Sequence, residues 1–155
     1  TFVCAGSRDG RGGTFRRYFG LEDYAFRFGK DGYLAIDTKD YLIANNLGTQ
    51  DSTLRRLRRE IKAVRWSIGF THRFDESMGV RSQLTLFVDD PLDVLVFGER
   101  PDSKDEGAIL VPWGKTAAIT TAAAFDGAWR LSEVSSSGAA KTEILSLTAE
   151  PPAKE

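Results

Sequence analysis

The sequence predicts a single domain that mixes α and β structure, and three observations lead to this. Residues 53–64 place apolar side chains at helical spacing, which is typical of an amphipathic helix. Residues 66–70 and 92–97 are short apolar runs typical of buried strands, and residues 24–28 alternate in the manner of a half-buried strand. At 155 residues the chain has the length of one domain with one core. We expect that domain to span residues 1–150, followed by a polar tail at 151–155.

Composition excludes several classes of protein. Apolar residues make up 41% and charged residues 28%, and the net charge of −1 gives no overall attraction to nucleic acid or to an anionic membrane. Cys4 is the single cysteine, which excludes an internal disulfide framework and a cysteine-rich zinc site and favours a reducing compartment. No apolar run approaches the roughly 20 residues of a membrane helix, and no signal peptide is visible. We therefore expect a soluble protein.

The chain opens with what reads as a core strand at residues 1–5, so we expect sequence upstream of Thr1. The loop at 6–13 holds four glycines, which suits either an anion-binding cradle or, more commonly, a tight surface loop. Residues 14–20 are aromatic and basic and are expected to pack beneath a loop. A hairpin follows, with strands at 24–28 and 33–36 and its turn at 30–32.

A crossover helix is predicted after an irregular connector at residues 41–50. Asp51 or Ser52 suits its N-cap. The spacing of the residues predicts an apolar stripe on one side of the helix and a basic face on the other. We expect the basic face to be solvated; the alternative is that it binds phosphates or an acidic partner. The stripe holds Leu54, Leu57, Ile61 and Val64; the basic face holds Arg55, Arg56, Arg58, Arg59 and Lys62.

The helix leads into the 66–70 strand, and His72, the only histidine in the chain, follows directly. Open α/β sheets place their chemistry just beyond the carboxyl ends of strands. His72 is therefore the first candidate site residue, and Asp37 closes an earlier strand in the same way. The remaining predicted elements are a helix at 77–90 that Pro91 ends, the 92–97 strand, and a run of antiparallel strands at 108–113, 116–125, 128–134 and 141–148.

From Thr1 to about Val134 this order of elements resembles the C-terminal half of a calcineurin-like metallophosphoesterase. Ala5–Asp9 stands where that family has Gly-Asn-His-Asp, and His72 is aligned with a metal-binding histidine. Leu92–Pro101 resembles the strand that ends in Gly-His-x-His, and Gly127–Leu131 resembles a late strand. The resemblance implies a layered β-sandwich flanked by helices, lacking its N-terminal half. It also implies two divalent metals (Mn, Fe or Zn) that activate water for phosphoester hydrolysis.

The departures from that family bear directly on function. Ser7 replaces an asparagine ligand, and Arg8 replaces the histidine that would protonate the leaving group. Glu99 and Pro101 replace the two histidines of the last motif, so His72 alone is unchanged. We therefore expect a degenerate, non-catalytic domain without a cofactor. It would act as a structural or interaction module, with other protein subunits or an upstream segment as its partners.

Two alternatives stay open at this stage. The first is an active metal-dependent phosphoesterase with an atypical ligand set, namely His72, Glu99 and Asp9, with Asp37 as a further carboxylate. The second is a metal-free anion or nucleotide binder, because arginines hold phosphate by bidentate hydrogen bonds. Its candidate residues lie on three loops that are expected to converge: Arg8, Arg11, Arg73 and Arg100.

Overall fold

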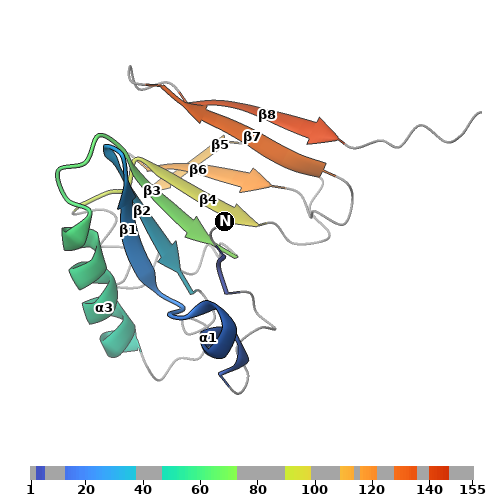
Figure 1. The fold of residues 1–155 in the computed structure, drawn as a ribbon. Helices are drawn as coiled ribbons and strands as arrows, with labels where there is room; N and C mark the ends of the chain where they lie inside the picture. The colour runs from blue at the N-terminus through green and yellow to red at the C-terminus, as the bar shows by residue number, and fades with distance from the viewer. Residues whose placement is uncertain are drawn as a thin grey trace, which may run out of the picture.

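The structure, a computed structural model, describes residues 3–5, 13–37, 47–72, 90–98, 109–113, 116–121, 128–135 and 140–146. Within these residues the chain folds into two helices, a six-stranded sheet and a two-stranded sheet (Figure 1). In chain order the elements are α1 (Thr14–Phe19), β1 (Tyr24–Phe28), β2 (Asp31–Ile36), α3 (Leu47–Glu60), β3 (Ser67–Thr71), β4 (Val94–Gly98), β5 (Ile109–Trp113), β6 (Thr116–Thr121), β7 (Ala128–Val134) and β8 (Ala140–Ser146).

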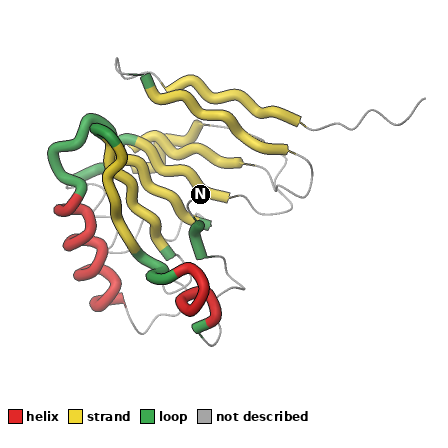
Figure 2. The backbone as a smooth tube through the Cα atoms, viewed as in Figure 1, coloured by secondary structure: helices red, strands yellow, loops and turns green. Residues whose placement is uncertain are grey.

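The larger sheet is mostly parallel and has the strand order β1-β2-β3-β4-β6-β5. Strands β2, β3, β4 and β6 run parallel, and β1 and β5 are antiparallel strands at its two edges. Figure 2 shows these strands side by side. The predicted mixture of α and β structure is therefore confirmed. The prediction that β6 belongs to a purely antiparallel run is wrong, because β6 joins β4 in parallel before it pairs with β5.

The β1–β2 hairpin is confirmed, but its turn lies one residue earlier than predicted. Phe28 pairs with Asp31, so the loop consists of Gly29 and Lys30, while Asp31 and Gly32 already belong to β2. Gly29 has a φ of 61°, and glycine at the first position of a two-residue loop is a favoured hairpin arrangement. Asp31 instead accepts two hydrogen bonds from the Arg65 guanidinium, at 2.8 and 2.6 Å.

Helix α3 begins earlier than predicted. It starts at Leu47, so the predicted N-cap at Asp51 or Ser52 is wrong, and the connector expected at 41–50 is helical from Leu47 onwards. The helix ends at Glu60, and the Arg27 side chain donates hydrogen bonds to the carbonyl oxygens of Glu60 and Lys62 at this end. Such bonds satisfy carbonyl groups that have no partner within a helix.

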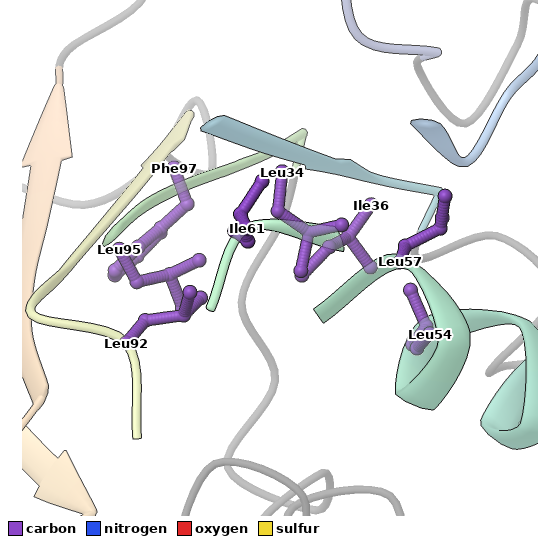
Figure 3. Packing of buried hydrophobic residues seen from close by; sticks show 8 residues of the cluster. All are labelled: Leu34, Ile36, Leu54, Leu57, Ile61, Leu92, Leu95 and Phe97. Carbon is purple, nitrogen blue, oxygen red and sulfur yellow. The ribbon is translucent and has the colours of Figure 1, made fainter. Parts of the chain in front are cut away.

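The predicted apolar stripe of this segment is confirmed as core. Leu54, Leu57 and Ile61 are buried (Figure 3). Val64 is partly buried and packs against the same cluster. These side chains cover the face of the sheet formed by Leu34, Ile36, Leu95 and Phe97. A Cβ atom added at Gly32 would lie 2.7 Å from the Ile61 Cβ atom. Glycine at this position therefore lets the segment that follows α3 approach the sheet closely.

The opposite face of the sheet carries an aromatic row. Phe26, Tyr33 and Phe70 come from three neighbouring strands, and their rings are stacked with centroids 4.8 and 6.2 Å apart. Just before β3, the Trp66 indole N–H donates to the Ser135 carbonyl oxygen at 3.0 Å. Because Ser135 follows β7 directly, this bond ties the β7–β8 hairpin to the larger sheet.

The N-terminal predictions need correction. Val3–Ala5 is not a strand, although Ala5 is buried and the Tyr24 hydroxyl donates to the Val3 carbonyl oxygen. Residues 14–19 form helix α1 rather than a loop with packed aromatics, and of the aromatic residues only Phe15 is buried. Its first turn holds no acidic residue and its N-cap makes no side-chain hydrogen bond, so the usual signals of a helix start are missing.

The other predicted elements divide into two groups. Strands β3, β4, β5, β6, β7 and β8 match predicted strands to within a few residues. The predicted helix at 77–90 falls almost wholly outside the described residues, as do the glycine-rich loop and the polar tail. In the part of the chain that is described, no helix is long and apolar enough to cross a membrane.

Candidate functional site

The four parallel strands end along one line, which we call the carboxyl edge. Thr71 on β3 is in register with Ile36 on β2 and with Phe97 on β4. The next residues along these strands are Asp37, His72 and Gly98, and Gly98 is in register with Thr121 of β6. The edge is thus marked by Asp37, His72, Gly98 and Thr121. It corresponds to the place where ligands bind in open α/β sheets.

His72 lies where the sequence predicts it, one residue beyond β3, and it is exposed. Its main chain packs tightly against the end of β4. A Cβ atom added at Gly98 would lie 2.8 Å from the His72 carbonyl oxygen and 4.0 Å from its Nδ1 atom. Only glycine fits here without moving backbone, so Gly98 holds the ends of β3 and β4 together beside the imidazole.

Asp37 closes β2 as predicted and is almost fully buried, at 2% exposed. Its backbone N–H donates to Oδ1 of Asp23 at 2.8 Å. Asp23 lies in the connection between α1 and β1, so this bond fixes the α1 region to the carboxyl edge. Asp37 therefore belongs to the framework of the edge, next to His72 in the strand order.

The Thr71 side chain adds a second buried polar group at this edge. It is 5% exposed, and its Oγ1 atom has no hydrogen-bond partner among the described residues. A buried hydroxyl without a partner costs about 1–3 kcal/mol relative to a bonded one. This unpaired hydroxyl belongs to the residue directly before the candidate histidine, His72.

The other predicted site residues lie outside the described residues. These are Asp9 and Glu99 as metal ligands, the arginines Arg8, Arg11, Arg73 and Arg100, and the altered positions Ser7 and Pro101. Two of them are immediate chain neighbours of the carboxyl edge, because Arg73 follows His72 and Glu99 follows Gly98. Within the described part of the chain, no three His, Cys, Asp or Glu side chains are grouped so that they could hold a metal ion.

The opposite ends of the same strands, which we call the amino edge, hold a polar network that the sequence analysis missed. Arg58 is 7% exposed, so its predicted place on the solvated face of the helix is wrong. Its guanidinium donates to the carbonyl oxygens of Asp90 and Pro91 at 3.1 and 3.0 Å and to the Asp90 carboxylate at 3.3 Å. The signal was available: Arg58 lies four residues after Leu54, which places it at the border of the apolar stripe.

Ser67 and Asp93 complete this network. The backbone N–H and the hydroxyl of Ser67 both donate to Oδ2 of Asp93, at 2.7 and 2.8 Å. The Asp93 N–H in turn lies 3.1 Å from Oγ of Ser67 and 3.0 Å from its carbonyl oxygen. The two residues lock the starts of β3 and β4 together, and we assign the amino edge a structural role.

Cys4 is half-buried, so the prediction of a buried small hydrophobe holds only in part. Burial raises the pKa of its thiol to about 11, so the thiol stays protonated near neutral pH. The thiolate is the nucleophilic and metal-binding form of cysteine. Cys4 is therefore no candidate for nucleophilic chemistry.

Comparisons with protein-family models, with curated proteins and with solved structures find no match to this chain.

Proposed function

We propose that this chain is a degenerate metallophosphoesterase-like domain that acts without catalysis, as a structural or interaction module in a larger assembly. One observation carries the proposal. The only histidine of the chain lies at the carboxyl edge, between Asp37 and Gly98. The two loops that resemble metal-binding motifs hold Ser7 and Arg8 in the first, and Glu99 and Pro101 in the second.

The chemistry of these side chains supports the proposal. Hydrolysis by two metal ions needs several imidazole and carboxylate ligands to clamp the phosphoryl group and to activate water. Proline has no side-chain ligand, and a permanently charged guanidinium repels a nearby cation. His72 and Glu99 alone supply too few ligands for a centre that binds two metal ions.

The arrangement of sheets supports the finer form of this proposal, a layered sandwich flanked by helices. Helix α3 covers one face of the larger sheet. The β7–β8 hairpin forms a separate small sheet, bonded to the larger one through Trp66 and Ser135. An isolated two-stranded sheet is marginally stable in water. An assembly that supplies further strands or covers this hairpin would remove that weakness.

A second candidate function is metal-dependent phosphoester hydrolysis with His72, Glu99 and Asp9 as ligands. Its support is the close packing of Gly98 on His72, because the chain runs from Gly98 directly into Glu99. Carboxylate oxygens suit hard divalent cations. His72, Glu99 and Asp9 would hold Mn, Fe or Zn, and such a metal would activate water for hydrolysis.

Two measurements on the purified chain distinguish these candidates. We expect elemental analysis to find no stoichiometric Mn, Fe or Zn, and we expect no hydrolysis of bis-p-nitrophenyl phosphate in excess Mn²⁺ above the rate of the buffer. His72→Gln should then equal the wild type. Arg59→Gln, on an exposed helix position far from the edge, is the matched control. Hydrolysis that His72→Gln abolishes and Arg59→Gln keeps would reject the non-catalytic assignment.

A further inference from the structure

Helix α1 presents an exposed apolar patch, which we call the α1 patch and define as Tyr18, Phe19 and Leu21 with Arg17. The three apolar side chains are 72%, 61% and 59% exposed. They lie within four residues at the C-terminal end of α1 and just after it, so this short segment exposes an unusual amount of apolar area, although Tyr18 and Phe19 point to different sides of the helix. Aromatic residues and arginine are also the types that protein interfaces favour.

The α1 patch is held in place by the fold. Phe15 on the same helix is 3% exposed, and its ring contacts that of Phe19 with centroids 5.1 Å apart. The bond from the Asp37 backbone to Asp23 fixes the segment that follows the helix. A patch anchored in this way loses little conformational freedom when it binds a partner.

The α1 patch is cationic. Its helix contains Arg16 and Arg17 and no acidic residue. Arg16 pairs with Glu22 at 3.2 Å. The exposed Arg17 makes no ion pair within the described residues, and its guanidinium lies 5.9 Å from the centre of the Tyr18 ring. A partner for this patch therefore needs an apolar centre and a carboxylate for Arg17.

A surface of that chemistry exists on the β7–β8 hairpin of the same chain. Leu131 is 43% exposed and stands opposite Glu143 in the register, on the same face of the hairpin. Glu133 and Glu143 are both exposed, and Glu133 stands opposite Lys141, so Glu143 is the carboxylate left without a basic residue across from it. We call Leu131, Glu133 and Glu143 the hairpin strip. An exposed leucine with an exposed carboxylate beside it complements the α1 patch.

We propose that the α1 patch of one copy of this chain binds the hairpin strip of a second copy. Figure 1 shows α1 and the β7–β8 hairpin at opposite ends of the molecule, so one copy cannot satisfy both surfaces by itself. A symmetric contact between two α1 patches would bring two unpaired arginines together, which like-charge repulsion disfavours. The contact is therefore head-to-tail, and such contacts build rings or open chains.

An anionic membrane is the competing occupant for a basic aromatic patch. Membrane-binding segments of this kind ordinarily carry clusters of about four to eight basic residues. Helix α1 carries two arginines, of which Arg16 is paired with Glu22, and the whole chain has a net charge of −1. Both observations favour a protein surface that carries a carboxylate.

Sedimentation velocity of the purified chain, from about 1 μM to about 1 mM to cover weak and transient affinities, tests the proposal. We expect concentration-dependent association that weakens as salt rises, because screening reduces the charge term. The double substitution Tyr18→Ser with Phe19→Ser should weaken association about tenfold or more. Phe28→Ser is the matched control, because Phe28 is 73% exposed and lies outside the patch.

Charge exchange gives the decisive test. Arg17→Glu and Glu143→Arg should each weaken association, and the chain that carries both changes should regain it, since the two groups face each other across copies. A chain that stays monomeric throughout the range, or a double change that fails to regain association, would overturn the proposal. Binding of the monomer to phosphatidylserine vesicles would assign the patch to membranes instead.

The inference rests on the proposed interaction role, but its test is independent of the test for hydrolysis. A monomeric chain without phosphodiesterase activity would reject self-association and leave the non-catalytic assignment standing. A chain that self-associates and also hydrolyses the phosphodiester through His72 would reject the non-catalytic assignment and leave self-association standing.

Discussion

Strands β3 and β4 differ at their two ends in how their polar groups are satisfied, although the amino edge also holds one buried hydroxyl without a partner among the described residues, that of Thr116 at the start of β6. At the amino edge, Arg58, Ser67 and Asp93 donate and accept hydrogen bonds with one another and with nearby carbonyl groups. At the carboxyl edge, Thr71 carries a buried hydroxyl without a partner among the described residues, and His72 is exposed. The comparison separates the hydrogen-bonded network that joins the starts of β3 and β4 from the ends of the same strands, where Thr71 is unpaired and His72 is exposed.

Breaking the amino edge should have the largest effect. Arg58→Ala leaves the carbonyl groups of Asp90 and Pro91 without their charged donor, and we expect a loss of about 2–4 kcal/mol in the free energy of unfolding. Arg58→Lys should recover little of it, because one ammonium group cannot reproduce the forked set of bonds. Urea denaturation measures both.

Arg59→Ala, at the exposed neighbouring position, is the control and should change stability by less than about 0.5 kcal/mol. Equal losses in the two variants would show that Arg58 is solvated in solution and that the amino edge is not a structural network.

The carboxyl edge is sensitive at Gly98. Gly98→Ala places a methyl group 2.8 Å from the His72 carbonyl oxygen, and backbone cannot rotate away, so we expect a loss of about 1–3 kcal/mol. In Gly69→Ala the new methyl group meets the Cδ1 atoms of Leu92 and Leu95 at 2.6 and 2.9 Å. The ends of side chains can shift, so the smaller loss is expected there. Thermal unfolding of both variants gives the order, and the reverse order would contradict the close approach of β3 and β4.

The Thr71 hydroxyl offers a direct contrast with the Ser67 hydroxyl at the other end of β3. Thr71→Val replaces the unpaired hydroxyl with a methyl group of similar size and should be neutral or stabilise the chain by up to about 1 kcal/mol. Ser67→Ala at the amino edge removes a bonded hydroxyl and should cost about 1 kcal/mol. Chemical denaturation of the pair measures the difference. A destabilised Thr71→Val chain would mean that this hydroxyl is bonded in solution.

The smallest expected effect is a dependence on pH at the hairpin. The hydrogen bonds from Arg65 hold the pKa of Asp31 below its ordinary value of 3.8. Because the pKa is lower in the folded chain, the stabilisation is present above that ordinary value and is lost as the pH falls through the folded-state pKa. In Arg65→Gln the urea midpoint should therefore fall less steeply as the pH is lowered from about 5 to about 2 than it does in the wild type. The ion pair is exposed, so added salt should reduce the effect in the wild type.

Much of this fold follows from local patterns in the sequence. The alternation at 24–28 and the stripe at 54–64 fix the hairpin and the packing face of α3, and the apolar runs fix β3 and β4. The position of His72 follows from the apolar run at 66–70, because the histidine comes just after the strand that this run predicts. These elements are readable because hydrophobic spacing and secondary structure share the same period.

The burial of Arg58 was readable from its spacing to Leu54, whereas the other errors come from places where local spacing carries no information. Arg58 stands in a repeat of basic residues and differs from Arg59 only by which side of the helix it occupies. Helix α1 lacks an acidic first turn and a capping side chain. The parallel pairing of β6 with β4 joins segments distant in sequence, and no local signal encodes such a partner choice.

Strand β5 precedes β6 in the chain but lies outside it in the sheet. During synthesis, a chain that has emerged only as far as Trp113 therefore cannot complete the sheet, because the strand that belongs beside β4 is still missing. Until residue 121 has left the ribosome, the side of β4 that will receive β6 offers unpaired backbone groups to any passing strand. At this stage of synthesis the chain is therefore open to misassembly at β4, until β5 and β6 pair with each other and β6 joins β4.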